Sequence, residues 1–245
     1  MAWSYVGAGA IAEPMSGNAT PALPAGWAAD DIFLCGIISN DNVNSTLPGG
    51  WTAIDAGTNN GAQVRTTLYY RRAVGGDTAP LVTHPAGGMI TAVVVAYRGI
   101  TTDNPPTDVI SATYVTAGAS VTLTFHNVGI TTTVNNDLVV EFGPHFGYLI
   151  ANASGYTGAP TPTERVDNPS ALNRPAIVIA DFPKAAAGAT GSRVATISNG
   201  HLSNGLLVSF KPLLIPWTGK VMGVTNPAKV MGVDVANIAK VHGVA

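Results

Sequence analysis

The chain has 245 residues, of which 11% are charged, and its formal net charge is −2; an average soluble domain has about 25% charged residues. The 12 Lys and Arg residues are too few and too scattered for the basic face that nucleic-acid binding requires, and a single cysteine excludes a disulfide scaffold. A hydrophobic content of 46% excludes disorder, and the longest strongly apolar run, residues 89–97, is far shorter than the ~20 residues of a membrane helix.

In the first half, short apolar or alternating runs are separated by Gly, Pro, Asn and Asp and are rich in Thr, Val, Ile and aromatic residues. This pattern is typical of β-strands. The run from Ile90 to Tyr97 is almost continuously apolar, which favours a strand covered on both sides. We predict strands at residues 3–8, 21–23, 31–39, 51–55, 64–72, 81–83 and 89–98.

The second half repeats this plan, with strands predicted at residues 113–117, 121–125, 137–142, 163–166, 176–182, 193–198 and 206–212. Segments of the two halves match in order. Residues 30–34 correspond to 136–140, residues 65–68 to 174–178, and residues 89–98 to 204–211, where Tyr97 matches Phe210. This order indicates an internal duplication.

The sequence therefore predicts an all-β protein of two related antiparallel β-sandwich units, jelly-roll or immunoglobulin-like, at residues 1–102 and 103–216. Two packings remain open: tandem sandwiches, or two sheets of one larger sandwich. The Pro-rich segment 99–108 is predicted to be a linker or a long loop that crosses between sheets.

Residues 217–245 form a tail with a different pattern, in which the unit Lys-Val-x-Gly-Val occurs three times. One such unit has too little surface to bury alone, so the three units either stack on a partner chain or dock on the body of the same chain. We expect the first, in which the tail mediates assembly. Pro227 forbids a continuous helix through the first joint. The predicted assembly residues are Lys220, Val221, Gly223, Val224, Lys229, Val230, Gly232, Val233, Lys240, Val241, Gly243 and Val244.

Known catalytic motifs are absent from the sequence, so we expect no enzymatic activity, no catalytic residues, no cofactor and no resident metal. Glu141 could form a glycosidase pair of carboxylates with Glu164 or Asp181, but acidic residues spread over many strands offer such combinations freely. His126 and His145 could meet in space, although a structural or surface role is favoured.

Three other features have both a functional and a structural interpretation. Asx clusters such as 40–42 could bind Ca²⁺ and are also the preferred turn formers. Trp51 is predicted to be a core aromatic at the start of a strand, whereas an exposed Trp could stack on a sugar ring. Cys35 lies in an apolar run and is predicted to be a buried, reduced thiol.

A family resemblance is carried in the body by residues 6–9, 21–26, 31–34, 48–52, 70–73, 96–100 and 131–140. In these segments the chain resembles the β-rich virion proteins of tailed bacteriophages. The tail, with Lys-Val-x-Gly-Val and residues 236–240, is similar to the short repeats that end many phage fibre and decoration proteins. The variable position holds Met222, Met231 and His242, where such repeats are expected to hold Asn.

The resemblance implies a structural virion component: a fibre, tail or capsid-decoration subunit that contributes to host-surface attachment. We therefore expect a homo-oligomer, with a trimer favoured, that contacts other virion proteins and a host-surface glycan. A non-catalytic carbohydrate-binding module or adhesin is the alternative. The N-terminus lacks the basic region of a signal peptide, so we expect synthesis and assembly in the host cytoplasm without membrane insertion.

Overall fold

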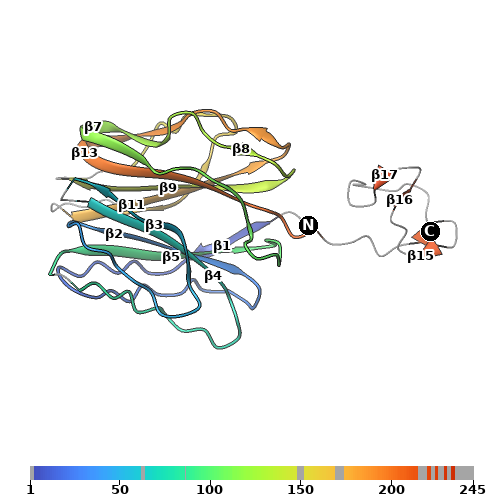
Figure 1. Cartoon of the computed structure of the whole chain (residues 1–245), viewed down its shortest axis with the longest axis horizontal. Helices are drawn as coiled ribbons and strands as arrows, with labels where there is room; N and C mark the ends of the chain where they lie inside the picture. The colour runs from blue at the N-terminus through green and yellow to red at the C-terminus, as the bar shows by residue number, and fades with distance from the viewer. Residues whose placement is uncertain are drawn as a thin grey trace.

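The computed structural model describes residues 3–61, 64–85, 87–147, 152–168 and 174–214, together with four two-residue strands between residues 220 and 234. Every regular element among these residues is a β-strand, and the main strands form two antiparallel sheets that pack face to face (Figure 1). The predicted all-β fold class, with antiparallel β-sandwich architecture, is therefore confirmed.

The first sheet comes entirely from the first half of the chain. Its strands are β1 (Ser4–Ala8), β2 (Ile32–Ser39), β3 (Thr52–Asn60), β4 (Val64–Arg72) and β5 (Ile90–Arg98), arranged in the order β1-β5-β2-β4-β3. Every residue of β2 is buried, as is every residue of β5 except its last. These central strands are continuously apolar because both of their faces are covered.

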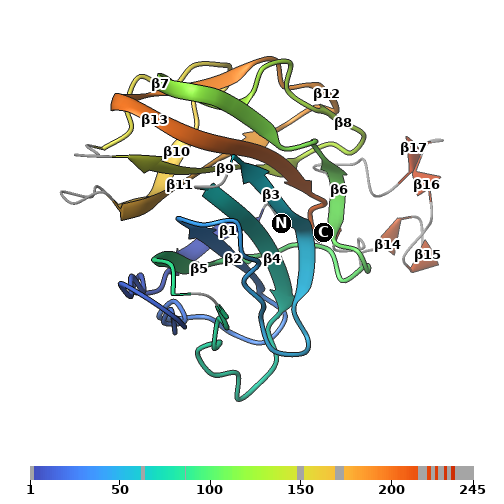
Figure 2. The same ribbon diagram turned by 60° about the vertical axis from the view of Figure 1, so that its left-hand side comes forward.

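The second sheet comes from the second half. Its strands are β6 (Thr107–Ile110), β7 (Tyr114–His126), β9 (Asp137–Gly147), β10 (Thr163–Asp167), β11 (Arg174–Lys184) and β13 (Arg193–Phe210). The order is β10-β11-β9-β13-β6, and β7 also pairs with β13. A small ribbon of β8 (Thr131–Thr132) and β12 (Gly188–Ala189) lies beside it (Figure 2).

The two sheets have the same topology. If β1, β2, β3, β4 and β5 are matched in chain order with β6, β9, β10, β11 and β13, the strand order of one sheet becomes that of the other. The registers match as well, because Ile32 pairs with Tyr97 in the first sheet and Leu138 pairs with Phe210 in the second. The predicted equivalence of Tyr97 with Phe210 is confirmed, and Asp31 and Asp137 each directly precede the equivalent residues.

Irregular features of the backbone repeat too. The edge strands β1 and β6 each have a one-residue bulge at the equivalent point. In β1 it lies between Tyr5 and Gly7, and in β6 it lies between Thr107 and Ile110, opposite Val208 to Phe210. Among the described residues, the two non-glycine residues with positive φ are Asp30 at 71° and Asn136 at 64°. Asp30 lies two residues before Ile32, which pairs with Tyr97, and Asn136 lies two residues before Leu138, which pairs with Phe210. Such angles are uncommon outside glycine, so these shared features support the relationship between the halves.

A single apolar core lies between the sheets. It includes Leu34 and Val95 from the first sheet and Val140, Ile179 and Val208 from the second, all buried. Strands β1–β5 lie within residues 1–102 and β6–β13 within residues 103–216, so each predicted unit provides one wall of this shared core. The two halves therefore face each other through their sheets.

The outer face of each sheet has a cluster of its own. Loops cover the first sheet, where Phe33, Cys35 and Val94 are buried beneath them. Strand β7 and the first part of β13 cover the second sheet, where Leu123 and Phe182 are buried. In Figure 1 these covers are the lowest and the highest layers of the body.

Several predicted boundaries were wrong. The runs 113–117 and 121–125 belong to one strand, β7, and the runs 193–198 and 206–212 are joined in β13, which ends at Phe210. Residues 21–23 form no strand, and residues 81–83 form isolated bridges at Val82 and Thr83. The predicted linker crosses from one sheet to the other and already contains the start of β6 at Thr107.

The described part of the tail consists of two short strand pairs. Strand β14 (Lys220–Val221) pairs with β15 (Val224–Thr225), and β16 (Lys229–Val230) pairs with β17 (Val233–Asp234). Each of the first two repeat units therefore folds back on itself.

Candidate functional site

A groove opens on the loop-covered face of the first sheet. Its floor is a row across three neighbouring strands: Phe33 of β2, Arg71 of β4 and Trp51 just before β3. Phe33 pairs directly with Arg71, and directly paired residues in antiparallel strands point to the same face. Two loop segments, 48–49 and 76–81, form the banks.

Aromatic rings form the apolar part of the groove. The Trp51 and Phe33 rings are stacked, with centroids 6.3 Å apart and an interplanar angle of 25°. Trp27 packs edge-on against the other side of this cluster, 5.4 Å from Phe33. Phe33 is fully buried, whereas Trp51 is half-buried and lines the groove, so the prediction that Trp51 is a core aromatic holds in part.

The Arg71 guanidinium is the polar part, and its position is fixed. It forms an ion pair with Asp77 and donates to the Gly49 carbonyl oxygen at 3.2 Å. The second Asp77 oxygen accepts from the Val74 amide at 2.8 Å. Gly50 has φ of 91°, and a Cβ there would lie 2.8 Å from Arg71 Nη1, so glycine permits this close approach.

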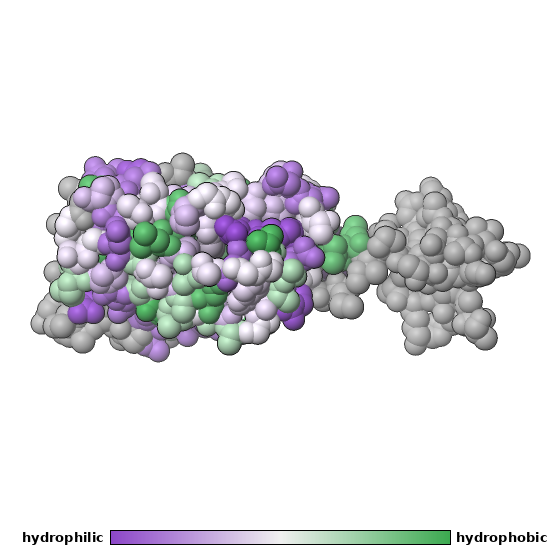
Figure 3. Space-filling model, turned by 90° about the horizontal axis from the view of Figure 1, so that it is seen from below, coloured by the Kyte–Doolittle hydropathy of each residue, from purple (hydrophilic) through white to green (hydrophobic). Residues whose placement is uncertain are grey.

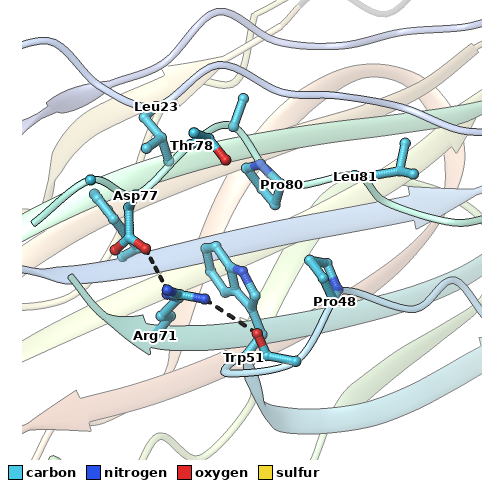
Figure 4. Close-up of a pocket in the computed structure, with 12 residues that line it drawn as sticks. Leu23, Pro48, Trp51, Arg71, Asp77, Thr78, Pro80 and Leu81 are labelled. Carbon is cyan, nitrogen blue, oxygen red and sulfur yellow. Dashed lines mark hydrogen bonds and ion pairs between the residues drawn. The ribbon is translucent and has the colours of Figure 1, made fainter. Parts of the chain in front are cut away.

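Figure 4 shows the indole of Trp51 flanked by Arg71 and Asp77 on one side and by Pro48 on the other, with Thr78 and Pro80 on the opposite bank. The hollow measures about 400 Å³ and adjoins a second of about 300 Å³, which shares Arg71 and is also lined by Tyr70 and Arg72. Pockets for small molecules have volumes of about 300–1,000 Å³. An aromatic surface beside a fixed donor and acceptor can bind a polar ring without covalent chemistry.

The three acidic residues weighed as a glycosidase site do not form one. Glu141 and Glu164 both lie opposite Ala180, on the outer face of the second sheet, whereas Asp181 belongs to the inner face. There Asp181 accepts from Tyr97 at 3.0 Å and from Arg165 at 2.7 Å.

Glu141 forms a buried ion pair with Arg193, whose Nε donates to it at 2.5 Å. Burial raises the pKa of Glu141 to about 7, although the Arg193 guanidinium acts against that rise. Arg193 is itself fully buried and also donates to the Pro160 carbonyl at 3.1 Å. The ion pair therefore holds the segment around Pro160 against the sheet. Because both side chains are buried, neither faces an open cleft that a substrate could enter.

The structure brings together a serine, a histidine and an aspartate that the sequence analysis missed. Ser45 Oγ lies 3.0 Å from His84 Nδ1, and His84 Nε2 lies 3.1 Å from Asp41 Oδ2. Ser45 and His84 are each only 3% exposed, so this hydroxyl does not face a substrate. The three side chains connect two loops, and the nonlocal spacing of 39 residues between Ser45 and His84 gave no sequence signal.

The other candidates have local structural roles. Asp41 accepts from the Val43 amide at 3.0 Å, the Asx-turn interpretation of its cluster. His126 pairs with Arg193 and His145 with Ser203, so the two histidines lie at well-separated points along β13. No group of three potential metal ligands occurs among the described residues.

Cys35 is fully buried, as predicted, and this burial raises the pKa of its thiol.

The tail residues are only partly covered by the structure. Six of the twelve predicted assembly residues lie in the short strand pairs: Lys220, Val221, Val224, Lys229, Val230 and Val233. The remaining six lie outside the described residues: Gly223, Gly232, Lys240, Val241, Gly243 and Val244.

Comparisons of the chain with protein-family models, with curated proteins and with solved structures found no match in any of the three. In the part of the chain that the structure describes, no helix has the length and hydrophobicity needed to cross a bilayer.

Proposed function

We propose that the protein is a structural component of a tailed-phage virion, a fibre, tail or capsid-decoration subunit, which contributes to attachment at the host surface. The observation that carries the proposal is the combination of a body with its own central core and a repetitive Lys-Val-x-Gly-Val tail. This is the arrangement expected of a displayed module joined to an assembly segment. The resemblance of body and tail to phage virion proteins supports it.

The tail is the proposed assembly element. Short extended segments leave backbone N–H and C=O groups unpaired along their outer edges, and each such group needs a partner when buried. Association of tails from three chains, or addition of a strand to a neighbouring virion protein, satisfies these groups and covers the valines. A homotrimer assembled in the host cytoplasm is the favoured form.

Deleting residues 218–245 tests this proposal. The body keeps all of its core, so the truncated protein should unfold at the same temperature as the full chain, within about 2 °C by circular dichroism. It should be monomeric in light scattering, whereas the full chain should be trimeric, and it should fail to enter particles in a complementation assay. Normal oligomerisation and incorporation of the truncated protein would refute the assembly role.

A non-catalytic carbohydrate-binding module or adhesin is the second candidate. The groove at Trp51 favours it, because this groove places an aromatic ring beside a fixed arginine and a carboxylate. It is compatible with the first proposal if the virion subunit also contacts the host. Neither proposal requires an enzymatic activity or a cofactor.

A further inference from the structure

The outer faces of the two sheets are covered differently at equivalent positions. In the second sheet, the positions equivalent to Phe33, Trp51 and Arg71 are Val139, Pro162 and Phe182. There the protein covers its own sheet, because the Arg193 guanidinium lies 3.9 Å above the Phe182 ring. Tyr156, from the covering segment, stacks on Phe125 with ring centroids 6.2 Å apart.

In the first sheet the corresponding region is open. The loops leave a hollow of about 400 Å³ over Phe33 and Trp51, and the guanidinium that lines it belongs to the sheet itself. Where the second half fills this region with an arginine from β13, the first half offers Arg71 to a ligand from outside. The difference between related halves indicates a binding site in the first half.

We propose that this groove binds a neutral saccharide, with one sugar ring against the Trp51 indole and its neighbouring hydroxyls on Arg71 and Asp77. The inference rests on the attachment role proposed above and assigns that role to named residues. The apolar face of a pyranose ring matches an aromatic surface, and vicinal hydroxyls match a planar guanidinium.

Hydrogen-bonding capacity favours a sugar over other ligands. A hydroxyl both donates and accepts. The Arg71 guanidinium has five N–H donors, of which Asp77 and the Gly49 carbonyl accept two. Each Asp77 oxygen accepts one hydrogen bond, from Arg71 or from the Val74 amide, and keeps a second lone pair for a ligand. The groove thus offers both hydrogen-bond donors and hydrogen-bond acceptors, and the groups that carry them are already held in place.

Charge and surface character favour a small neutral ligand over an ion or a large protein partner. The positive charge of Arg71 is compensated by Asp77, so the groove has no excess charge with which to attract an ion. On the face seen in Figure 3, hydrophobic residues are scattered among polar ones and do not form one broad patch. A broad exposed apolar patch would instead mark a site for a large protein partner.

The test is an array of neutral oligosaccharides built from glucose, galactose, mannose and N-acetylglucosamine, probed with the full-length protein. The best-bound oligosaccharide is then titrated while tryptophan fluorescence is recorded. Arg71→Gln removes the guanidinium that is proposed to bind the sugar hydroxyls. Ala79→Trp fills the groove with a large side chain from an exposed lining position. Each should weaken binding at least about tenfold.

The matched control is Ala186→Trp, which places the same side chain on an exposed turn of the second half. It should bind as the unsubstituted protein does. If Arg71→Gln lowers the unfolding temperature, the Ala79→Trp result decides, because that variant removes no native contact of the groove.

The inference would be overturned if the protein bound no neutral oligosaccharide on the array or bound charged glycans alone. It would also be overturned if Ala79→Trp and Ala186→Trp bound the oligosaccharide equally well. Selective binding of a peptide in the groove would do so too. Because saccharide binding is measured on the full chain and particle entry on the tail deletion, each proposal can fail while the other holds.

Discussion

Asp31 and Asp137 occupy equivalent positions in the two halves but have opposite electrostatic surroundings. The Asp31 carboxylate, 1% exposed, accepts two hydrogen bonds of 2.8 Å from Arg98. Asp137 is fully buried and faces the carboxyl group of Asp108. Burial, and then this neighbour, raise the pKa of Asp137 to about 8, so it holds a proton at neutral pH.

Asp137→Asn should therefore make the protein more stable at high pH. In the unfolded chain an aspartate ionises near pH 4, whereas folded Asp137 stays protonated up to about pH 8. Ionisation lowers the free energy of the unfolded state across this interval, so the native protein loses stability as the pH rises from about 4 to about 8. The neutral amide removes this loss.

Urea unfolding at pH 5 and pH 9 measures the effect. Between pH 5 and pH 9, the stability difference in favour of the variant should grow by about 4 kcal/mol, at about 1.4 kcal/mol for each pH unit up to the pKa of folded Asp137. The matched control Asp31→Asn should be destabilised at both pH values, because it leaves Arg98 without its carboxylate. Equal pH dependence of Asp137→Asn and the unsubstituted protein would contradict the assignment of the proton.

Sequence reasoning could find most elements of this fold because alternation and turn residues are local signals. It could match Tyr97 with Phe210, because both lie at the apolar end of an equivalent strand. It missed β6, since four residues inside a Pro-rich segment carry too little pattern. It could not find the groove, because residues 76–81 come to lie opposite Trp51 through the folding of a loop and not through any periodicity.

The two sheets approach each other closely where Gly36 of β2 faces Phe142 of β9. A Cβ on Gly36 of β2 would come within 2.6 Å of the Phe142 ring of β9, a distance that carbon atoms do not tolerate. Gly36→Ala should therefore destabilise the protein by about 1–3 kcal/mol through overpacking of the core. Thermal unfolding measures the change.

The control is Gly75→Ala, where a Cβ would meet no atom within 4 Å. It should leave the unfolding temperature nearly unchanged. Adding Phe142→Leu to Gly36→Ala should recover part of the loss, since the smaller side chain makes room for the new methyl group. A Gly36→Ala variant as stable as Gly75→Ala would show that the sheets can separate at this point at little cost.

The shared core makes the body one cooperative unit. Leu34 and Val140 stand at equivalent positions on the two sheets, and both belong to the central cluster. Removal of side-chain volume from either sheet lowers the stability of both, because neither sheet keeps its inner face covered when the other unfolds.

Val140→Ala tests this coupling across the molecule. Three of the four tryptophans, Trp3, Trp27 and Trp51, lie in the first half, and the fourth, Trp217, lies in the tail. With Trp217→Phe introduced into both proteins, the fluorescence reports on the sheet that does not contain the Val140→Ala substitution. Loss of two methyl groups should cost about 1–3 kcal/mol and move the fluorescence midpoint together with the circular dichroism midpoint. A fluorescence midpoint that stays in place would mean that the halves unfold independently.

The contact between Gly36 and Phe142 has a consequence for the origin of the molecule. The two residues occupy equivalent positions in their halves, and they face each other across the core. In a symmetric homodimer of a single half, both positions would carry the same residue. Two phenylalanines would collide and two glycines would leave a void. When the two halves belong to one chain, each can change alone, so a small residue in one sheet can accommodate a large one in the other. The same freedom allows one copy to close its outer face while the other keeps a groove.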